Sequence, residues 1–213
     1  MAIKVANNQS LTAITALPAA VSGGAMNLLE TQTASSSSTI SFTSNIDSTY
    51  DEYVFKFYDI HPATDGAYLT FQADTGTNTS YNQTITSTFF YAQHDEADTD
   101  GSMAYATTRD LAQGTGFQPI SLSINNDNDS SYAGTLQIFD PSSTTFVKNF
   151  ISVSNEYGNG DLSYGSYAAG YLNVTTALTR FQFKMSSGNI DAVQFKFHSG
   201  NIDSGVIKLY GIK

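Results

Sequence analysis

Short segments in which apolar and polar residues alternate recur along the chain from Ile40 onward, and this pattern constrains the fold most strongly. Alternation with a period of two is typical of strands that have one face in a core and the other in solvent. Examples are Tyr53, Phe55 and Phe57, and also Ile120, Leu122 and Ile124. Asp-Gly and Asn-Gly turn signals separate about ten such segments, with no convincing amphipathic helix between them.

Strands that follow one another without helices pair antiparallel, and they bury their apolar faces when two sheets pack together. The sequence therefore predicts an all-β fold, an antiparallel two-sheet jelly-roll-like sandwich. A length of 213 residues is consistent with one such domain.

The pentapeptide Ser-Gly-Asn-Ile-Asp occurs twice, at residues 187–191 and 199–203. Each copy leads into an apolar-Lys-apolar segment, at residues 195–197 and 207–209. Gly and Asn tolerate positive φ and Asp bonds its own backbone, as a tight turn requires. We interpret the repeat as a turn that precedes a strand, not as a ligand-binding repeat.

The first part of the chain differs from the rest. It is rich in Ala, Leu and Thr, it is interrupted by Pro18 and Gly23-Gly24, and it ends at four consecutive serines, residues 35–38. This composition predicts an N-terminal arm over residues 1–34, used for anchoring or oligomerisation, followed by a β-sandwich domain over residues 35–213.

Charge and cysteine content exclude several classes of function. Charged residues make up only 13% of the chain, and the formal net charge is −10. An acidic chain without a basic patch is not expected to bind nucleic acid or a membrane surface. The chain has no cysteine, so disulfides, thiolate metal sites and a cysteine nucleophile are excluded. The N-terminus lacks the apolar core of a signal peptide, so we expect synthesis and assembly in a cytoplasm.

An acidic stretch at residues 94–101 is the candidate metal site. Its carboxylates are those of Asp95, Glu96, Asp98 and Asp100. Oxygen ligands at alternate positions before a glycine suit calcium, although the spacing does not match an EF-hand loop. A solvated turn is the favoured alternative, and no other cofactor is expected.

Residues 157–171 are rich in Tyr, Ser, Gly and Asn, a mixture typical of recognition surfaces. The candidate ligand-binding residues are Tyr157, Asn159, Asp161, Tyr164 and Tyr167. A glycan on a host surface is the candidate ligand. The alternative is that these tyrosines pack half-buried with the hydroxyl at the rim.

No catalytic residues are predicted. The chain has three histidines and no Gly-x-Ser-x-Gly motif. The carboxylate pairs Asp51-Glu52 and Asp95-Glu96 are sequence neighbours, which point to opposite faces of a strand instead of facing each other across a cleft. We therefore expect a protein that is not an enzyme.

Several segments carry a resemblance to a protein family. They are residues 28–36, 40–43, 46–53, 60–65 and the closing stretch Ile207-Lys208-Leu209-Tyr210-Gly211-Ile212-Lys213. In these the chain resembles small virion structural proteins of tailed bacteriophages, particularly marine ones. The resemblance implies a virion protein displayed on the particle surface, either a capsid decoration (cement) protein or a tail fibre component.

Such a protein would stabilise the particle or aid host attachment. The expected partners are other virion proteins, contacted through the arm, and further copies of the chain in a homo-oligomer, first of all a trimer. The alternative function is that of a carbohydrate-binding, lectin-like module for host adhesion.

Overall fold

The structure is a computed structural model that describes residues 25–158, 160–183 and 201–213. These residues form strands and irregular connections, without helices. The strands are β1 (Asn27–Ser37), β2 (Ile40–Phe42), β3 (Glu52–Pro62), β4 (Thr70–Thr75), β5 (Ile85–Asp95), β6 (Gly101–Tyr105), β7 (Gln118–Pro119), β8 (Tyr132–Phe139), β9 (Lys148–Gly158), β10 (Leu162–Leu172), β11 (Leu178–Phe183) and β12 (Ile202–Ile212).

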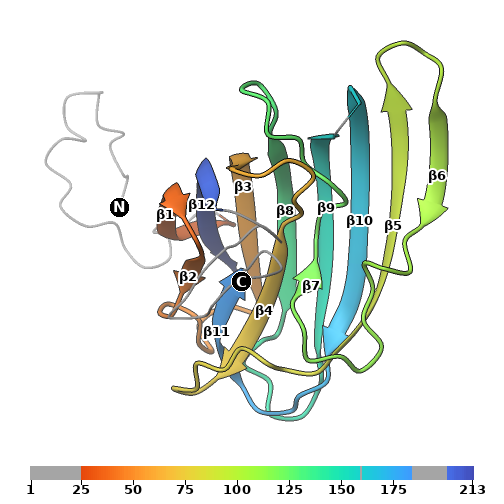
Figure 1. Cartoon of the computed structure of the whole chain (residues 1–213). Helices are drawn as coiled ribbons and strands as arrows, with labels where there is room; N and C mark the ends of the chain where they lie inside the picture. Colours follow the sequence, from red (N-terminus) through yellow and green to blue (C-terminus); the bar gives the residue numbers. More distant parts are fainter. Residues whose placement is uncertain (1–24, 159, 184–200) are drawn as a thin grey trace, which may run out of the picture.

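The strands form two antiparallel sheets that face each other (Figure 1). The large sheet has eight strands in the order β1-β12-β3-β8-β9-β10-β5-β6, and the small sheet has four in the order β2-β11-β4-β7. The chain crosses from one sheet to the other several times, so strands that are far apart in sequence become neighbours, as β3 and β8 do. The predicted all-β sandwich of two antiparallel sheets is confirmed.

The large sheet begins earlier in the chain than the sequence analysis expected. Residues 27–34, which were assigned to the arm, lie in β1 and pair with β12, with Asn27 opposite Gly211. β1 is an edge strand whose side chains are mostly exposed, so it lacks the apolar alternation by which the other strands are recognised. Residues 1–24 lie outside the described residues.

The second copy of the repeated pentapeptide leads into a strand, as predicted, because β12 begins at its Ile202. Ile207 and Leu209 are buried, and Lys208 between them is not. The first copy, at residues 187–191, and the segment at residues 195–197 lie outside the described residues.

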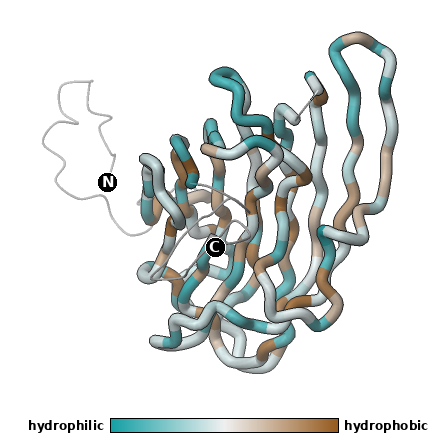
Figure 2. Tube along the Cα trace, in the orientation of Figure 1, coloured by the Kyte–Doolittle hydropathy of each residue, from teal (hydrophilic) through white to brown (hydrophobic). Residues whose placement is uncertain are grey.

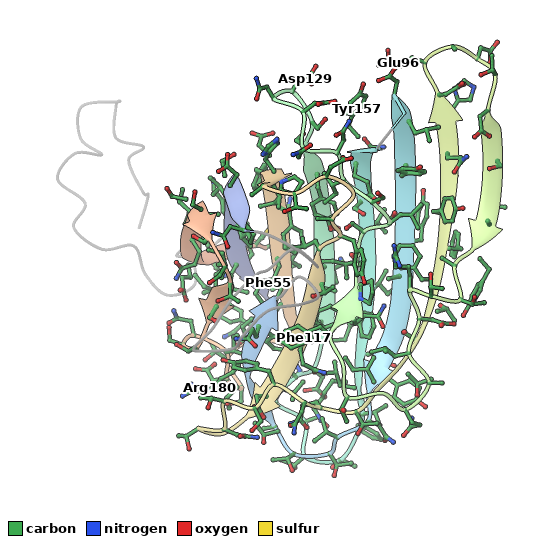
Figure 3. All side chains as sticks on the ribbon, viewed as in Figure 1. Phe55, Glu96, Phe117, Asp129, Tyr157 and Arg180 are labelled. Carbon is green, nitrogen blue, oxygen red and sulfur yellow. The ribbon has the colours of Figure 1, made fainter. Side chains whose placement is uncertain are left out.

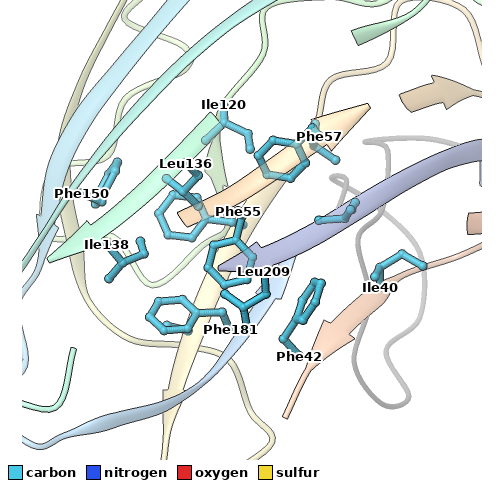
Figure 4. Packing of buried hydrophobic residues seen from close by; sticks show 14 of the residues in the cluster. Ile40, Phe42, Phe55, Phe57, Ile120, Leu136, Ile138, Phe150, Phe181 and Leu209 are labelled. Atoms are coloured by element: carbon cyan, nitrogen blue, oxygen red, sulfur yellow. The ribbon is translucent and has the colours of Figure 1, made fainter. Parts of the chain in front are cut away.

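Aromatic rings fill the space between the sheets (Figure 4). The Phe55 ring lies with its centroid 5.2 Å from that of Phe42 and 5.7 Å from that of Phe181. Phe71 meets Phe150 edge to face at 4.9 Å. Offset and edge-to-face contacts are the favoured geometries for aromatic pairs. The alternation of Tyr53, Phe55 and Phe57 therefore places all three side chains in the core, as predicted.

A strand was predicted at Ile120, Leu122 and Ile124, but these residues follow the end of a strand and do not belong to one. Strand β7 ends at Pro119, and the chain continues as an extended segment. The Ile120 N–H donates to the Leu69 carbonyl and the Ile124 N–H to the Ala67 carbonyl, each at 2.8 Å. Both isoleucines are buried, so the alternation indicated burial correctly but did not indicate a regular ladder.

The small sheet meets the β10-β5-β6 half of the large sheet through its short edge strand β7, whose Gln118 accepts a hydrogen bond from the Ser87 hydroxyl on β5. The long connection between β6 and β8 lies over the inner face of this half, and buried side chains bind its backbone. The Gln72 amide donates to the Gly116 carbonyl at 2.9 Å, and the Gln118 amide donates to the Arg109 carbonyl at 2.9 Å. Buried backbone groups need such partners, because an unpaired one costs about 1–3 kcal/mol.

Glu156, fully buried on the inner face of β9, is the acidic member of this network. Its carboxylate accepts hydrogen bonds from the Leu122 N–H at 2.6 Å and the Ser166 hydroxyl at 2.7 Å. The Leu122 carbonyl accepts a bond from the Arg109 guanidinium at 3.1 Å. Burial raises the pKa of Glu156 to about 7, in opposition to the hydrogen bonds, which lower it.

This raised pKa makes stability depend on pH. Because the folded-state pKa lies above the ordinary 4.5, the fold prefers the protonated carboxyl. Protonated Glu156 makes its full contribution to the free energy of unfolding in acid, and this contribution is lost as the pH rises through about 7. We expect the Glu156→Gln variant, whose amide oxygen still accepts from Leu122 and Ser166, to lack this loss. Relative to that variant, the wild-type protein should lose about 3 kcal/mol of unfolding free energy between about pH 4.5 and pH 8.

Denaturant unfolding at a series of pH values measures this difference. Glu96→Gln is the matched control, because Glu96 is exposed and its replacement should leave the wild-type pH profile unchanged. An unfolding profile of Glu156→Gln that falls with pH as steeply as that of the wild type would contradict the assignment.

Candidate functional site

The outer face of the large sheet, which points away from the small sheet, has two chemically different halves. Over β3 and β12 it carries Lys56 and Lys208, which lie directly opposite each other. Their ammonium groups lie 5.9 Å from the Tyr210 ring and 5.4 Å from the Tyr58 ring. The two ammonium groups, held over tyrosine rings by cation–π contacts, give this half a positive charge.

The other half is apolar. Six large apolar side chains are exposed on β5, β6, β9 and β10, and we call them the apolar patch: Phe90, Met103, Tyr105, Ile151, Val153 and Tyr167. Their exposed fractions run from 39% for Tyr167 to 74% for Met103. At about 200 Å² for a full aromatic side chain, the patch exposes about 500 Å² of apolar surface. A contiguous patch of this size on a soluble protein commonly marks a contact site.

Strand register aligns part of the patch in a single line across the sheet. We call this line the central row: Tyr105, Phe90, Tyr167, Val153 and Thr135, each opposite the next on adjacent strands. The Phe90 and Tyr167 rings are stacked, with centroids 4.9 Å apart and planes inclined by 8°. A groove of about 450 Å³ lies beside the row, lined in part by Phe139, Ile151 and Tyr171.

A second candidate site lies at the end of the sandwich where Glu96, Tyr157 and Asp129 are found (Figure 3). Hydrophilic residues gather in the loops at this end (Figure 2). A pocket of about 180 Å³ here is lined by His94, Asp95, Glu96, Tyr157, Asp161 and Ser163. The Glu96 N–H donates to the Asp161 carbonyl at 3.2 Å, and this bond joins the acidic loop to the tyrosine-rich segment.

Within this end pocket, the Tyr157 hydroxyl donates to the Asp161 carboxylate at 2.7 Å. This hydrogen bond is the main cause that raises the pKa of Tyr157 to about 12, because the carboxylate stabilises the protonated phenol. The pair offers a hydroxyl and a carboxylate oxygen to a polar ligand.

The structure divides the predicted ligand-binding residues among three places. Tyr157 and Asp161 lie in the end pocket, and Tyr167 lies in the apolar patch on the outer face. Tyr164 points to the inner face, is nearly buried and meets the Tyr91 ring edge to face at 5.9 Å. Asn159 lies outside the described residues. The prediction of one site made from all five residues is therefore not supported by the positions of the four that are described.

The four carboxylates proposed for calcium do not converge on one point. Asp95 accepts bonds from the Thr99 hydroxyl and N–H and from the Asp100 N–H, which lower its pKa to about 2. Asp98 lies 3.3 Å from His94, and Asp100 accepts from the Gln93 amide at 2.6 Å. Among the described residues no group of three or more His, Cys, Asp or Glu side chains is arranged to hold a metal ion.

Comparison with known proteins assigns no relative to the chain. No family profile, no curated protein and no solved structure matches it. The described residues include no helix long and apolar enough to cross a membrane.

The apolar patch was missed by the sequence analysis, although the sequence contains a signal for it. Phe150, Ile151 and Val153 place apolar residues at both parities of one strand. In β9 only Phe150 among the large apolar side chains points inward, and Ile151 and Val153 point out. Apolar residues on both faces of a strand indicate a second buried surface beyond the domain's own core.

The Tyr157–Asp161 contact leads to a prediction about proton affinity. Asp161 has φ 58°, a left-handed conformation that Asn also tolerates. In the Asp161→Asn variant the neighbouring negative charge is lost, so the Tyr157 pKa should fall from about 12 toward the ordinary value of about 10. NMR of ¹³C-labelled tyrosine rings through an alkaline titration measures the Tyr157 pKa in each variant.

Asp98→Asn is the matched control, because Asp98 also has positive φ but contributes nothing to the Tyr157 pKa. A Tyr157 pKa that is the same in Asp161→Asn and in the wild type would show that the hydrogen bond is not formed in solution.

Proposed function

We propose that the chain is a non-enzymatic structural protein of a tailed bacteriophage particle, displayed on the particle surface as a decoration protein or a tail fibre component. It stabilises the particle or aids attachment through a contact surface. The observation that carries the proposal is the apolar patch of about 500 Å² on the outer face of the large sheet. A particle protein needs such a surface to bind its neighbours.

The hydrogen bonding of the described carboxylates supports a role without catalysis. The described carboxylates that are most strongly bound, those of Glu156, Asp74 and Asp95, each accept several hydrogen bonds from nearby backbone or side chains. They hold connections in place. The resemblance in residues 28–36, 40–43, 46–53, 60–65 and 207–213 supports the assignment to a virion. Trimer formation through residues 1–34 stays a prediction.

A lectin-like host-adhesion module is the alternative, and the end pocket favours it. Tyr157 and Asp161 supply polar groups beside an aromatic ring, which suits a sugar. The bound glycan would lie at the end of the sandwich, away from the apolar patch.

Mass spectrometry of gradient-purified particles tests the leading proposal, with particles taken from a phage that encodes the chain. We expect its peptides at a copy number comparable to that of other particle proteins. If the chain were abundant in the infected lysate but missing from washed particles, the proposal would fail.

A glycan-binding screen tests the alternative. A lectin should bind at least one glycan saturably, and Tyr157→Phe and Asp161→Asn should each weaken that binding about tenfold, the loss expected for one hydrogen bond to a charged group. Asp98→Asn should leave it unchanged. Binding that none of the three variants affects would exclude the end pocket as the site.

A further inference from the structure

We propose that the central row is a self-complementary interface, on which a second copy of this chain packs face to face about a two-fold axis. This names the partner of the contact surface on which the proposed function rests. The axis would pass beside Tyr167, the middle residue of the row, so that the large sheets of the two copies stack through their outer faces.

The sizes of the side chains in the row fit such an axis. One end of the row is bulky, with Tyr105 and Phe90, and the other end is small, with Val153 and Thr135. A two-fold axis at Tyr167 places Phe90 against Val153 of the second copy and Tyr105 against its Thr135. In an isologous interface each contact occurs twice, so bulky side chains meet small ones on both sides of the axis.

The area of the face also fits. A stable interface buries about 800 Å² on each partner, and about 65% of the core of a homodimer interface is apolar. The apolar patch supplies about 500 Å². The neighbouring small and polar side chains on the same face, such as Thr88, Ala92 and Ala169, supply surface around it. The apolar patch alone is therefore about as large as the apolar part of such an interface.

Charge favours this face over others for contact between identical chains. Each copy carries a net charge of −10, so two copies repel each other. The central row and the rest of the apolar patch contain no charged residue. The nearest carboxylate that the row contacts is Asp110, which accepts from the Tyr105 hydroxyl at 2.6 Å at the bulky end of the row. Added salt should therefore strengthen the association by screening the net charge.

Sedimentation equilibrium of the full chain tests the interface. The Val153→Lys variant places a charge at the contact, and Val153 is 43% exposed, so the fold should tolerate it. At the same protein concentration, we expect the wild-type protein to sediment as a dimer, with twice the mass of the Val153→Lys variant. Leu28→Lys is the matched control, because Leu28 is 55% exposed on β1 at the opposite edge of the same sheet. It should keep the wild-type mass.

Exchanging the side chains at positions 90 and 153 tests whether these two positions contact each other across the interface. Phe90→Val alone should weaken the dimer about tenfold, because it leaves a gap against Val153 of the second copy. The double variant Phe90→Val with Val153→Phe should restore it, because each copy then places a bulky ring opposite a small residue again. The two positions are separated by Tyr167 within one chain, so this rescue acts only between copies.

Equal masses for wild type and Val153→Lys, with far-ultraviolet circular dichroism unchanged, would overturn the proposal. So would a dimer that Phe90→Val weakens but the double variant fails to restore. These outcomes are independent of the particle test, since a chain missing from particles could still dimerise and a chain found in particles could be a monomer in solution.

Discussion

The sandwich depends on how the inner face of the large sheet is covered beyond the edge of the small sheet. The small sheet has only four strands against eight, so the inner face of β5, β10 and the Glu156 end of β9 is covered mostly by the connection between β6 and β8, in which β7 is a strand of two residues. A connection has no ladder to satisfy its peptide groups, and buried side chains take that role. Glu156 accepts from the Leu122 N–H, and Arg109 donates to the carbonyl of the same residue. The Glu156 contact holds the connection against the sheet, and the Arg109 contact joins two parts of the connection; the cost is a buried carboxyl whose pKa is raised.

The same closure explains the chemistry of the outer face. In β9 the inward positions carry Ser152, Ser154 and Glu156, and the outward positions carry Ile151 and Val153. Polar side chains are needed inside to bind the connection, and a large apolar outward face is typical of a contact site. The inverted pattern of this strand therefore links the internal network to the proposed contact surface.

Where one face of a strand packs on the other sheet, the sequence alone correctly predicted which side chains are buried. Tyr53, Phe55 and Phe57 show this in β3, and Ile207 and Leu209 show it in β12. The pattern fails at β1, where nearly all side chains are exposed or half-buried, and at Ile120 to Ile124, where the Ser121 hydroxyl replaces part of the ladder by accepting from the Leu69 N–H. It also fails for Lys148, whose ammonium donates to the Phe146 and Val174 carbonyls while the residue is fully buried. No local pattern predicts a tertiary partner for such a group.

For the candidate sites, sequence reasoning found part of the end pocket. It named Tyr157 and Asp161 on one segment and Asp95 and Glu96 on another, and the structure brings these together. Parity separates the remaining tyrosines, because Tyr164 and Tyr167 lie three positions apart on one strand and so point to opposite faces. The central row could not be predicted, because it is made by the register of five strands.

The central claim is that the outer face of the large sheet binds a second copy through unlike ends of the central row. Isotope-filtered NMR on a mixture of ¹³C-labelled and unlabelled protein measures this contact directly. The account predicts nuclear Overhauser effects between the Phe90 ring of one copy and the Val153 methyl groups of the other, which disappear on dilution. A mixture that is dimeric at the concentration used, yet shows no such effects between Phe90 and Val153, would contradict it.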